Sequence, residues 1–319
     1  MKILFTGQSA EIRRQIPGRN SLEGLALKNG HTIAQHLEEK PDVLICMDWN
    51  RSSGSLVRRA NTLGVPTTLV KGEPSIVVPG HLSSEIDGLF QRVIELGRPM
   101  GKPVVRYPIN WDVNFFDNSL RLHRAVAVSA NKFSFVSGEL YSLRAEAYSK
   151  LDSLDLFGVG WDRSLLKNAM KMGRELQIAS NSKFTSLTYG CAKSLKIKPL
   201  NYLGQSENKL HTISKYRVSL VIENSTEYMS EKLMDSILAG AIPVYVGPPV
   251  EAFEIPPDLV ISADSNFTSI KVAIDRALQV TYKGWHELAR EWLQTPGVRE
   301  KWDIPKVNNL VLRLATLEA

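Results

Sequence analysis

Residues 216–248, YRVSLVIENSTEYMSEKLMDSILAGAIPVYVGP, decide the fold that we expect for this chain. The pattern predicts a buried strand that ends at Ile222, a polar turn, and an amphipathic helix that opens at Glu231 with Ser230 as its cap. Gly240 ends this helix, and a second buried strand follows. A parallel strand that leads through a polar turn into a helix N-terminus is the usual anion site of α/β folds, because free backbone N–H groups and the positive helix end meet there.

The rest of the chain repeats the alternation of strands and helices. Such alternation predicts parallel, doubly wound sheets. We expect strands at 2–7, 41–47, 66–70, 92–96, 126–130, 154–159 and 259–263, helices at 23–38, 53–63, 82–90, 139–151, 269–279, 283–293 and 305–317, and a loop at 13–22. The segment 164–198 is only partly helical in pattern.

These elements form two similar halves on either side of a Pro- and Gly-rich crossing between residues 99 and 108. We therefore predict an α/β protein of the GT-B architecture, in which two Rossmann-like doubly wound domains face a cleft, in preference to one large sheet. The expected boundaries are an N-terminal domain at 1–123, a C-terminal domain at 124–295 and a helical tail at 296–319. A chain of 319 residues is long enough for two such domains.

The composition narrows the classes of partner. The net charge of +6 and the pI of about 9.2 fit an anionic partner such as a nucleotide, a nucleic acid or a membrane surface. The basic residues are scattered and form no strip interleaved with aromatic residues, so we expect no nucleic-acid partner. Only two cysteines occur, Cys46 and Cys191, which indicates a reducing compartment rather than a metal cluster.

The sequence contains no apolar run of about 18 residues and no signal peptide at its N-terminus. We expect a cytoplasmic protein and leave peripheral contact with a membrane open. An Asp-x-Asp motif is also absent from the sequence, so we expect no metal site.

Three segments of the quoted stretch resemble the donor-binding signature of the family-10 α-1,3/1,4-fucosyltransferases. The family pattern is roughly F-E-N-[ST], Y-[VI]-[TS]-E-K and L-x-A-G-[AC]-[VI]-P-[VI]. The resemblance covers about residues 124–295 and is weak over 1–120. It departs from the family at Ile222, where Phe is usual, and at Glu227, which adds a carboxylate before the tyrosine. The matching segments are Glu223-Asn224-Ser225, then Tyr228-Met229-Ser230-Glu231-Lys232-Leu233, then Leu238-Ala239-Gly240-Ala241-Ile242-Pro243-Val244.

This resemblance implies an inverting, metal-independent glycosyltransferase that moves L-fucose from GDP-fucose to a hydroxyl of a glycan. The donor would be a substrate, with no permanently bound cofactor. The implied processes are lipopolysaccharide biosynthesis and protein glycosylation; the oligomeric state stays undetermined. Two alternatives stay open, namely a GT-B transferase that uses another nucleotide sugar and a nucleotide-sugar-binding protein without turnover.

The resemblance also implies that the domain at 1–123 binds the acceptor and that the domain at 124–295 binds the nucleotide-sugar donor. Lys232 would neutralise the diphosphate. The helix dipole disfavours a cation in the first turn of a helix, and an anionic ligand such as a phosphate would compensate for this cost. Glu231 would bind the ribose hydroxyls. Arg144, which lies at the start of the expected helix at 139–151, would also contact the diphosphate, with Lys132 as a weaker alternative.

Four further residues of the turn belong to the expected donor site. Glu223, at the end of a strand, would face the sugar and take part in catalysis. Asn224 and Ser225 would bind the donor or simply form the turn. Tyr228 would either line the guanine pocket or belong to the core.

An inverting transferase also needs a base that takes the proton of the acceptor hydroxyl. In the family this base comes from the N-terminal domain. We select Glu73, because it follows the third strand of the first half in a Gly-Glu-Pro turn. Glu95 and Asp48 are the competitors, and His81 is expected to be an ordinary surface or capping histidine.

Overall fold

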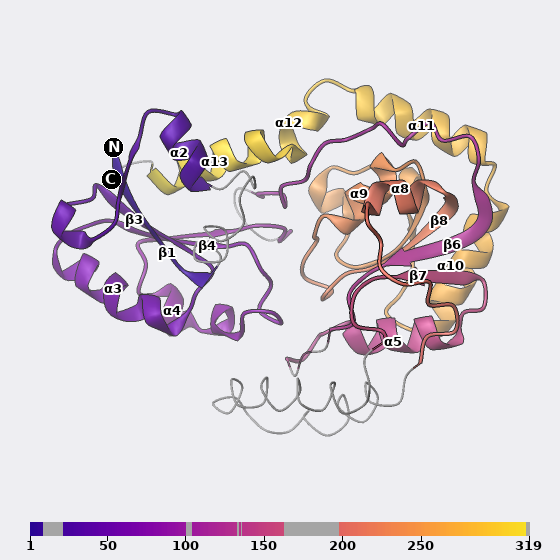
Figure 1. Ribbon diagram of the computed structural model, residues 1–319, viewed down its shortest axis with the longest axis horizontal. Coiled ribbons are helices and arrows are strands. Elements are labelled where there is room, and N and C mark those ends of the chain that lie inside the picture. Colours follow the sequence, from indigo (N-terminus) through magenta and orange to yellow (C-terminus); the bar gives the residue numbers. More distant parts are fainter. Residues whose placement is uncertain (9–21, 100–103, 133, 135, 163–197, 317–319) are drawn as a thin grey trace. The chain divides into compact units, whose positions relative to one another are not determined.

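The computed structural model describes residues 1–8, 22–99, 104–132, 134, 136–162 and 198–316. The chain divides into two compact units (Figure 1). Unit 1 combines Met1–Asn110 with Arg299–Ala319, and unit 2 is Trp111–Val298. None of the helices in the described ranges is both long and apolar enough to cross a membrane.

Unit 1 is built on a five-stranded parallel sheet in the order β2-β1-β3-β4-β5. Its strands are rich in β-branched and aliphatic residues, and β3 and β4 are buried along their whole length, as a sheet covered on both faces requires. The strands are β1 (Lys2–Thr6), β2 (Thr32–Ala34), β3 (Val43–Met47), β4 (Thr67–Lys71) and β5 (Arg92–Glu95).

Alternate side chains of these strands enter two separate cores. On one face, Ile3 and Ile45 pack in a cluster with α2 (Leu22–Lys28) and α13 (Ile304–Thr316). On the other face, Leu4 and Leu44 pack with α3 (Arg51–Thr62). The period of two along a strand therefore produces the doubly wound arrangement. Shorter helices complete the unit, namely η1 (Leu37–Glu39), η2 (Pro79–Leu82), α4 (Ser84–Asp87) and α12 (Val298–Trp302), which begins at the last residue of unit 2.

Unit 2 contains a second five-stranded parallel sheet, in the order β10-β9-β8-β6-β7. The helices α8 and α9 contact each other and β8, and α10 contacts β6, β8, β9 and α5 (Figure 1). The strands are β6 (Leu122–Val128), β7 (Leu154–Phe157), β8 (Tyr216–Ile222), β9 (Ile242–Val246) and β10 (Ile261–Ser262); the helices are α5 (Tyr141–Lys150), α8 (Lys209–Ser214), α9 (Lys232–Leu238), η4 (Val250–Phe253), η5 (Pro257–Leu259), α10 (Phe267–Gln279) and α11 (Tyr282–Gln294).

The two sheets have the same internal order. When the strands are numbered within their own unit, each sheet has the order 2-1-3-4-5. Strand 2 is thus added on one side of strand 1 and strands 3 to 5 on the other, so the strand order reverses between strands 1 and 3. Ligands of doubly wound folds bind beyond the carboxyl ends of the strands at such a switch point. The switch point lies between β1 and β3 in unit 1 and between β6 and β8 in unit 2.

The expected helix at 23–38 is wrong in its second half. The helix α2 ends at Lys28, and Gly30 follows with a φ of 82°, a left-handed conformation that glycine adopts without steric cost. Residues Thr32–Ala34 then pair with β1 as the edge strand β2. Pairing with a neighbouring strand therefore outweighs local helix propensity here. The expectations for 13–21 and for 164–197 lie outside the described residues.

The unit boundaries differ from those expected from the sequence. The tail expected at 296–319 belongs with unit 1, because α13 buries Val307, Val311, Leu312 and Ala315 in the same cluster as Ile3 and Ile45. Two backbone carbonyls near the end of α13 also accept hydrogen bonds from the sheet, that of Ala315 from the Thr68 hydroxyl at 3.1 Å and that of Leu314 from Arg92 at 2.5 Å. The amphipathic pattern predicts the helix but not the surface that it covers.

Leu312→Ala should therefore destabilise unit 1 strongly. Leu312 is only 2% exposed, and truncation of a buried leucine costs about 2–5 kcal/mol through lost burial and the cavity left behind. Arg313→Ala is the matched control, since Arg313 is exposed on the same helix. Equilibrium denaturation in guanidinium chloride checks this. Equal unfolding free energies for the two variants would show that α13 is not part of the unit 1 core.

Candidate functional site

The carboxyl edge of the unit 2 sheet carries the turn that was quoted first. After β8, residues 223–231 pass over the sheet edge to the start of α9. The Glu223 N–H donates to the Val246 carbonyl at the end of β9, and the Leu140 N–H donates to the Asn224 carbonyl. The turn is therefore attached to β9 on one side and to the start of α5 on the other.

Glu223 is completely buried, at 0% exposure, and forms the centre of this turn. Its carboxylate accepts hydrogen bonds from the Ser230 N–H at 3.0 Å and from the Ser230 hydroxyl at 2.6 Å. Its Oε2 also lies 3.5 Å from the Lys232 Nζ. A buried carboxylate must be paired in this way, since isolated burial of a charge is very costly. The expected Ser230 cap and the helix start at Glu231 are each wrong by one residue, because α9 begins at Lys232 with Glu231 in the cap position. The Ser230 hydroxyl donates to Glu223 and accepts the Lys232 N–H at a long 3.5 Å.

The space around Glu223 depends on Gly247. A Cβ atom at this position would lie 2.3 Å from the Tyr245 hydroxyl oxygen and 2.9 Å from the Glu223 Cγ. The Tyr245 hydroxyl is buried and has no hydrogen-bond partner among the described residues. Burial, together with the nearby Glu223 carboxylate, raises the pKa of Tyr245 well above its ordinary value. The glycine that follows β9 therefore makes room for two buried polar groups.

Arg144 is 3% exposed and holds the end of β8. Its Nε donates to the Ile222 carbonyl at 2.8 Å, and one Nη donates to the same carbonyl at 2.5 Å and to the Asn224 Oδ1 at 2.9 Å. The guanidinium also lies over the Tyr141 ring, 4.9 Å from its centroid. Arg144 and Asn224 are therefore brought together, and in this structure both maintain the turn.

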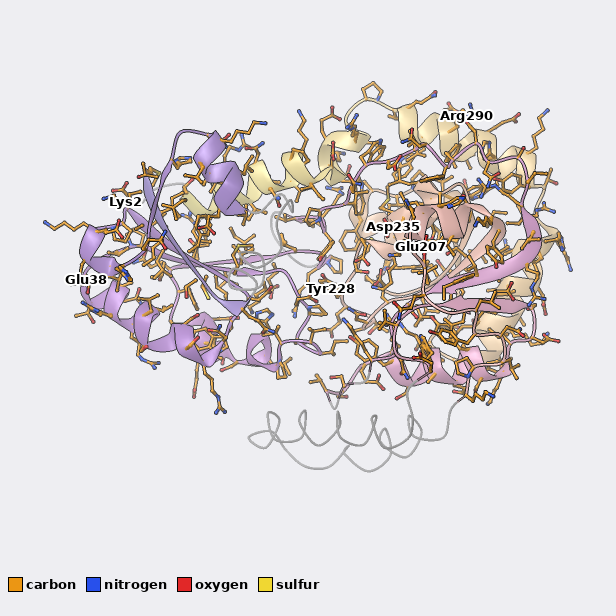
Figure 2. The ribbon with its side chains drawn as sticks, viewed as in Figure 1. Lys2, Glu38, Glu207, Tyr228, Asp235 and Arg290 are labelled. Atoms are coloured by element: carbon orange, nitrogen blue, oxygen red, sulfur yellow. The ribbon has the colours of Figure 1, made fainter. Side chains whose placement is uncertain are left out.

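The remaining turn residues divide between interior and surface. Ser225 forms isolated β-bridges with Glu139 and with Tyr228, and Tyr228 is only 2% exposed. The structure thus places Tyr228, labelled in Figure 2, in the interior. Glu227 is exposed, which is the placement that an extra carboxylate beside an anion site requires. Lys132, the weaker alternative to Arg144, is exposed after β6.

The N-terminus of α9 carries a group of alternating charges. The Lys232 ammonium donates to the Ser230 hydroxyl at 2.6 Å and lies 4.0 Å from the Glu231 carboxylate. Lys209 lies on the other side of Glu231, with its Nζ 3.2 Å from the Glu231 Oε1 and 2.5 Å from the Asp235 Oδ2. Burial alone would raise the pKa of Glu231, but Lys232 and Lys209 together lower it below its usual range.

A small cavity lies at the switch point of unit 2. It lies among the ends of β6 and β8 and the helices α8 and α9, and Lys209 and Lys232 form part of its walls. Its walls are formed by Val128, Ser129, Tyr148, Lys209, Ile213, Ser219, Leu220, Val221, Ile222, Lys232 and Ser236. Two cations at the carboxyl edge of a parallel sheet are suited to an anionic ligand.

The carboxyl edge of the unit 1 sheet contains a second buried carboxylate. Asp48 follows β3 and has a φ of 54°, a left-handed conformation that is uncommon outside glycine. Its Oδ1 accepts hydrogen bonds from the Gly72 N–H at 2.7 Å and the Glu73 N–H at 2.9 Å. Asp48, which was a competitor for the base, is 3% exposed and instead fixes the Glu73 turn.

His81 supports the same turn and is buried, contrary to the expectation of a surface histidine. Its Nε2 accepts the Trp49 N–H at 3.2 Å, so the proton of a neutral ring must be on Nδ1, which lies 2.8 Å from the Glu73 carbonyl. Burial lowers the pKa of His81 and outweighs the opposing effect of Asp48, whose Oδ1 is 3.8 Å away. The backbone of Glu73 is therefore held at both its N–H and its carbonyl.

Glu95, the other competitor for the base, belongs to an ion-pair network. Its Oε1 lies 3.3 Å from the Lys71 Nζ and 3.6 Å from an Arg98 Nη. Lys71 is 4% exposed and also pairs with Asp87 at 2.8 Å. Two cations therefore engage the Glu95 carboxylate in ion pairs. The half-buried Glu73 carboxylate is the better candidate.

Two residues of these sites escaped the sequence reasoning. Lys209 is 22 positions from Glu231, in a helix that was not expected. His81 lies in the short helix η2, eight positions from Glu73, and its buried role was not expected. Periodicity does not register either contact, because each joins separate elements. Within the described residues, no group of three or more His, Cys, Asp or Glu side chains is arranged to hold a metal ion.

The neutral state of His81 predicts a pH-dependent stability. The folded protein binds the second proton of the His81 ring less readily than the unfolded chain does, because the pKa of His81 is lowered from about 6.5 on folding. The contribution of neutral His81 to the free energy of unfolding is therefore fully present above pH ~6.5 and is lost as the pH falls. Relative to His81→Gln, the wild-type unfolding free energy should fall by up to about 1.4 kcal/mol per pH unit below pH ~6.5. The charged groups that face His81, Asp48, Lys71 and Arg98, are common to both proteins. Denaturant titrations at pH 7 and pH 5 measure the difference, and a constant difference would contradict a neutral His81.

Comparisons with known proteins point to the family that the sequence signature resembles. The sequence profile described as "Glycosyltransferase family 10 (fucosyltransferase) C-term" matches residues 168–288. "Alpha-(1,3)-fucosyltransferase 7" of Rattus norvegicus is 37% identical over 70 residues, which are 20% of this chain and 19% of that protein. The match therefore spans about a fifth of this relative's length.

Solved structures match over much more of the chain. The match to a crystal structure of an alpha1,3-fucosyltransferase covers 100% of this chain and 91% of that chain, with a TM-score of 0.57 and 14% sequence identity. The match to a crystal structure of alpha1,3-fucosyltransferase with GDP-fucose has the same coverage, with a TM-score of 0.53 and 15% sequence identity. The match to a UDP-forming trehalose-phosphate synthase from Burkholderia xenovorans covers 88% of this chain and 75% of that chain, with a TM-score of 0.55 and 13% sequence identity. At such identities these matches show the fold, which is GT-B. The profile and this relative show that parts of the chain are similar to family-10 fucosyltransferases, and the solved structures show that the chain has the GT-B fold.

Proposed function

We propose that this protein is an inverting glycosyltransferase that transfers L-fucose from GDP-fucose to a hydroxyl of a glycan acceptor. The observation that carries the proposal is the start of α9, where the Lys232 ammonium is held by Ser230 at 2.6 Å beside Glu231, at the switch point of the unit 2 sheet. The resemblance of the same residues to the family-10 signature supports a guanosine diphosphate sugar as the donor. Lipopolysaccharide or protein-linked acceptors, a cytoplasmic location and peripheral membrane contact belong to the same proposal.

Unit 2 would bind the donor. The Lys232 ammonium and the N-terminus of α9 neutralise the charge that develops on the diphosphate as it leaves. Glu231 accepts hydrogen bonds from the ribose hydroxyls. Arg144 and Asn224 act through the shape of the turn that they hold together at 2.9 Å, and Glu223 acts by orienting Lys232. Ser225 and Tyr228 complete the turn that surrounds the nucleotide.

Unit 1 would supply the base. The acceptor oxygen attacks the anomeric carbon of the sugar on the face opposite GDP, the bond from that carbon to the β-phosphate oxygen breaks, and Glu73 takes the hydroxyl proton. GDP leaves as the anion, so its charge must be stabilised by cations of the donor site. Two hydrogen bonds support this role, because a general base has to be held in a defined position: Asp48 accepts the Glu73 N–H, and the His81 Nδ1–H donates to the Glu73 carbonyl.

A first prediction tests the donor. GDP should bind the wild-type protein more tightly than UDP, and Lys232→Ala should weaken GDP binding by about 1.5–3 kcal/mol, the range for hydrogen bonds to charged groups. Isothermal titration calorimetry measures both. Lys215→Ala is the control, because Lys215 is exposed in the same unit. Equal affinity for GDP and UDP would favour another nucleotide sugar, and unchanged GDP affinity in a folded Lys232→Ala variant would exclude this site.

A second prediction tests the base. Glu73→Gln keeps the shape of the side chain but cannot accept the proton, so kcat should fall by about 10²–10⁴-fold with GDP affinity nearly unchanged. Glu95→Gln is the comparison, since that carboxylate pairs with Lys71 and Arg98 and should matter less for turnover. Initial rates of GDP release, measured with GDP-fucose and a glycan acceptor, decide whether Glu73 or Glu95 is the base. Near-normal turnover of Glu73→Gln, or a larger loss in Glu95→Gln, would move the base elsewhere. A complete absence of GDP release in the wild type would favour a binding protein without turnover.

A further inference from the structure

Lys209 links two helices at the edge of the candidate donor site. It is the first residue of α8, and its Nζ lies 2.5 Å from the Asp235 Oδ2 and 3.2 Å from the Glu231 Oε1. Asp235, labelled on α9 in Figure 2, is four positions after Glu231. One ammonium group thus joins two carboxylates of a different helix.

This position has an electrostatic reason. Carboxylates four residues apart on one helix face each other and repel. Burial by itself would lower the pKa of Lys209, but the carboxylates of Asp235 and Glu231 outweigh it and raise that pKa, so Lys209 stays charged. The cation therefore allows Glu231 and Asp235 to be ionised side by side.

The contacts of Glu231 also define its orientation. The two ammonium groups, of Lys209 and Lys232, both approach the Glu231 Oε1, at 3.2 Å and 4.0 Å. The side chain of Glu231 is 37% exposed, so its carboxylate can reach a ligand while Oε1 is held. A glutamate at such a position would otherwise sample several rotamers, with a corresponding entropic cost on binding.

We propose that Lys209 is a positioning residue of the donor site, which fixes the Glu231 carboxylate through Oε1 so that Oε2 accepts hydrogen bonds from the ribose hydroxyls of a nucleoside diphosphate. This inference rests on the proposed function, because it takes a nucleoside diphosphate as the ligand. Asp235 shares the same ammonium group, with its Oδ2 at 2.5 Å, and so competes with Glu231 for Lys209. Lys209 itself needs no contact with the ligand.

The test compares GDP with 2′,3′-dideoxy-GDP in each variant. If Glu231 accepts from the ribose, the wild type should bind GDP about tenfold or more tightly than the dideoxy compound. Lys209→Met removes the charge and keeps the length of the side chain, and it should reduce this ratio by about three- to tenfold. Lys209→Arg should restore the ratio, and Lys215→Met, at the exposed end of α8, should leave it unchanged.

The pH dependence of the same ratio separates positioning from a structural role. Without Lys209, Glu231 and Asp235 face each other with only Lys232 nearby, so the pair should bind a proton as the pH falls from 7 to 5. The ratio should then fall with pH in Lys209→Met and stay constant in the wild type. Protonation of the phosphate affects both nucleotides equally and cancels.

The outcomes are distinct. A wild-type ratio and a flat pH profile in folded Lys209→Met would overturn the positioning role and leave the proposed function intact. If Lys209→Met does not fold, Asp235→Asn decides, since Lys209 then pairs with Glu231 alone and the ratio should be at least that of the wild type; a lower ratio would overturn the proposal. A wild type that binds GDP but does not distinguish the two compounds would remove the ribose role of Glu231, and this inference with it, without affecting the preference for GDP over UDP.

Discussion

The hydrogen-bonded burial of the Glu223 carboxylate is the constraint on which the candidate donor site depends. A charge at 0% exposure is tolerated only when its partners compensate for the lost hydration, and here Ser230 supplies two hydrogen bonds while Lys232 supplies the opposite charge. The same contacts determine the path of the turn from β8 to α9. Lys232 therefore stands at the helix start because a buried acid holds it there, against the unfavourable helix dipole.

A comparable construction occurs in unit 1. Asp48, buried at the end of β3, accepts the N–H groups of Gly72 and Glu73 from the turn after β4. His81 then holds the carbonyl of Glu73. In both units a buried carboxylate at the switch-point strand fixes a turn by accepting backbone N–H groups, and the residue proposed to act on the substrate is more exposed than the carboxylate that supports it. Rigid support behind an accessible group is what precise positioning requires.

The charges at the start of α9 form a connected set rather than independent pairs. Lys232 lies between Glu223 and Glu231, and Lys209 lies between Glu231 and Asp235. Each of these carboxylates thus has an ammonium group within ion-pair distance, which lowers the free-energy cost of burying the carboxylate. An anionic ligand would meet two cations whose positions are already determined by the protein, so that little reorganisation accompanies binding.

The sequence by itself determined the fold class and the location of the turn between β8 and α9. Periodicity and turn residues are local properties, and they predict the strands β1, β3, β8 and β9 and the stop at Gly240, whose φ is 69°. The alternation of strands and helices in two similar halves was sufficient to predict the GT-B fold that the structural comparisons confirm. Only the tertiary structure decided the edge strand β2, the packing of α13 on unit 1 and the partners of Glu95, Asp48 and Glu231. These features depend on contacts between residues far apart in the chain, such as Lys209 and Glu231, and no local pattern records which surfaces will meet.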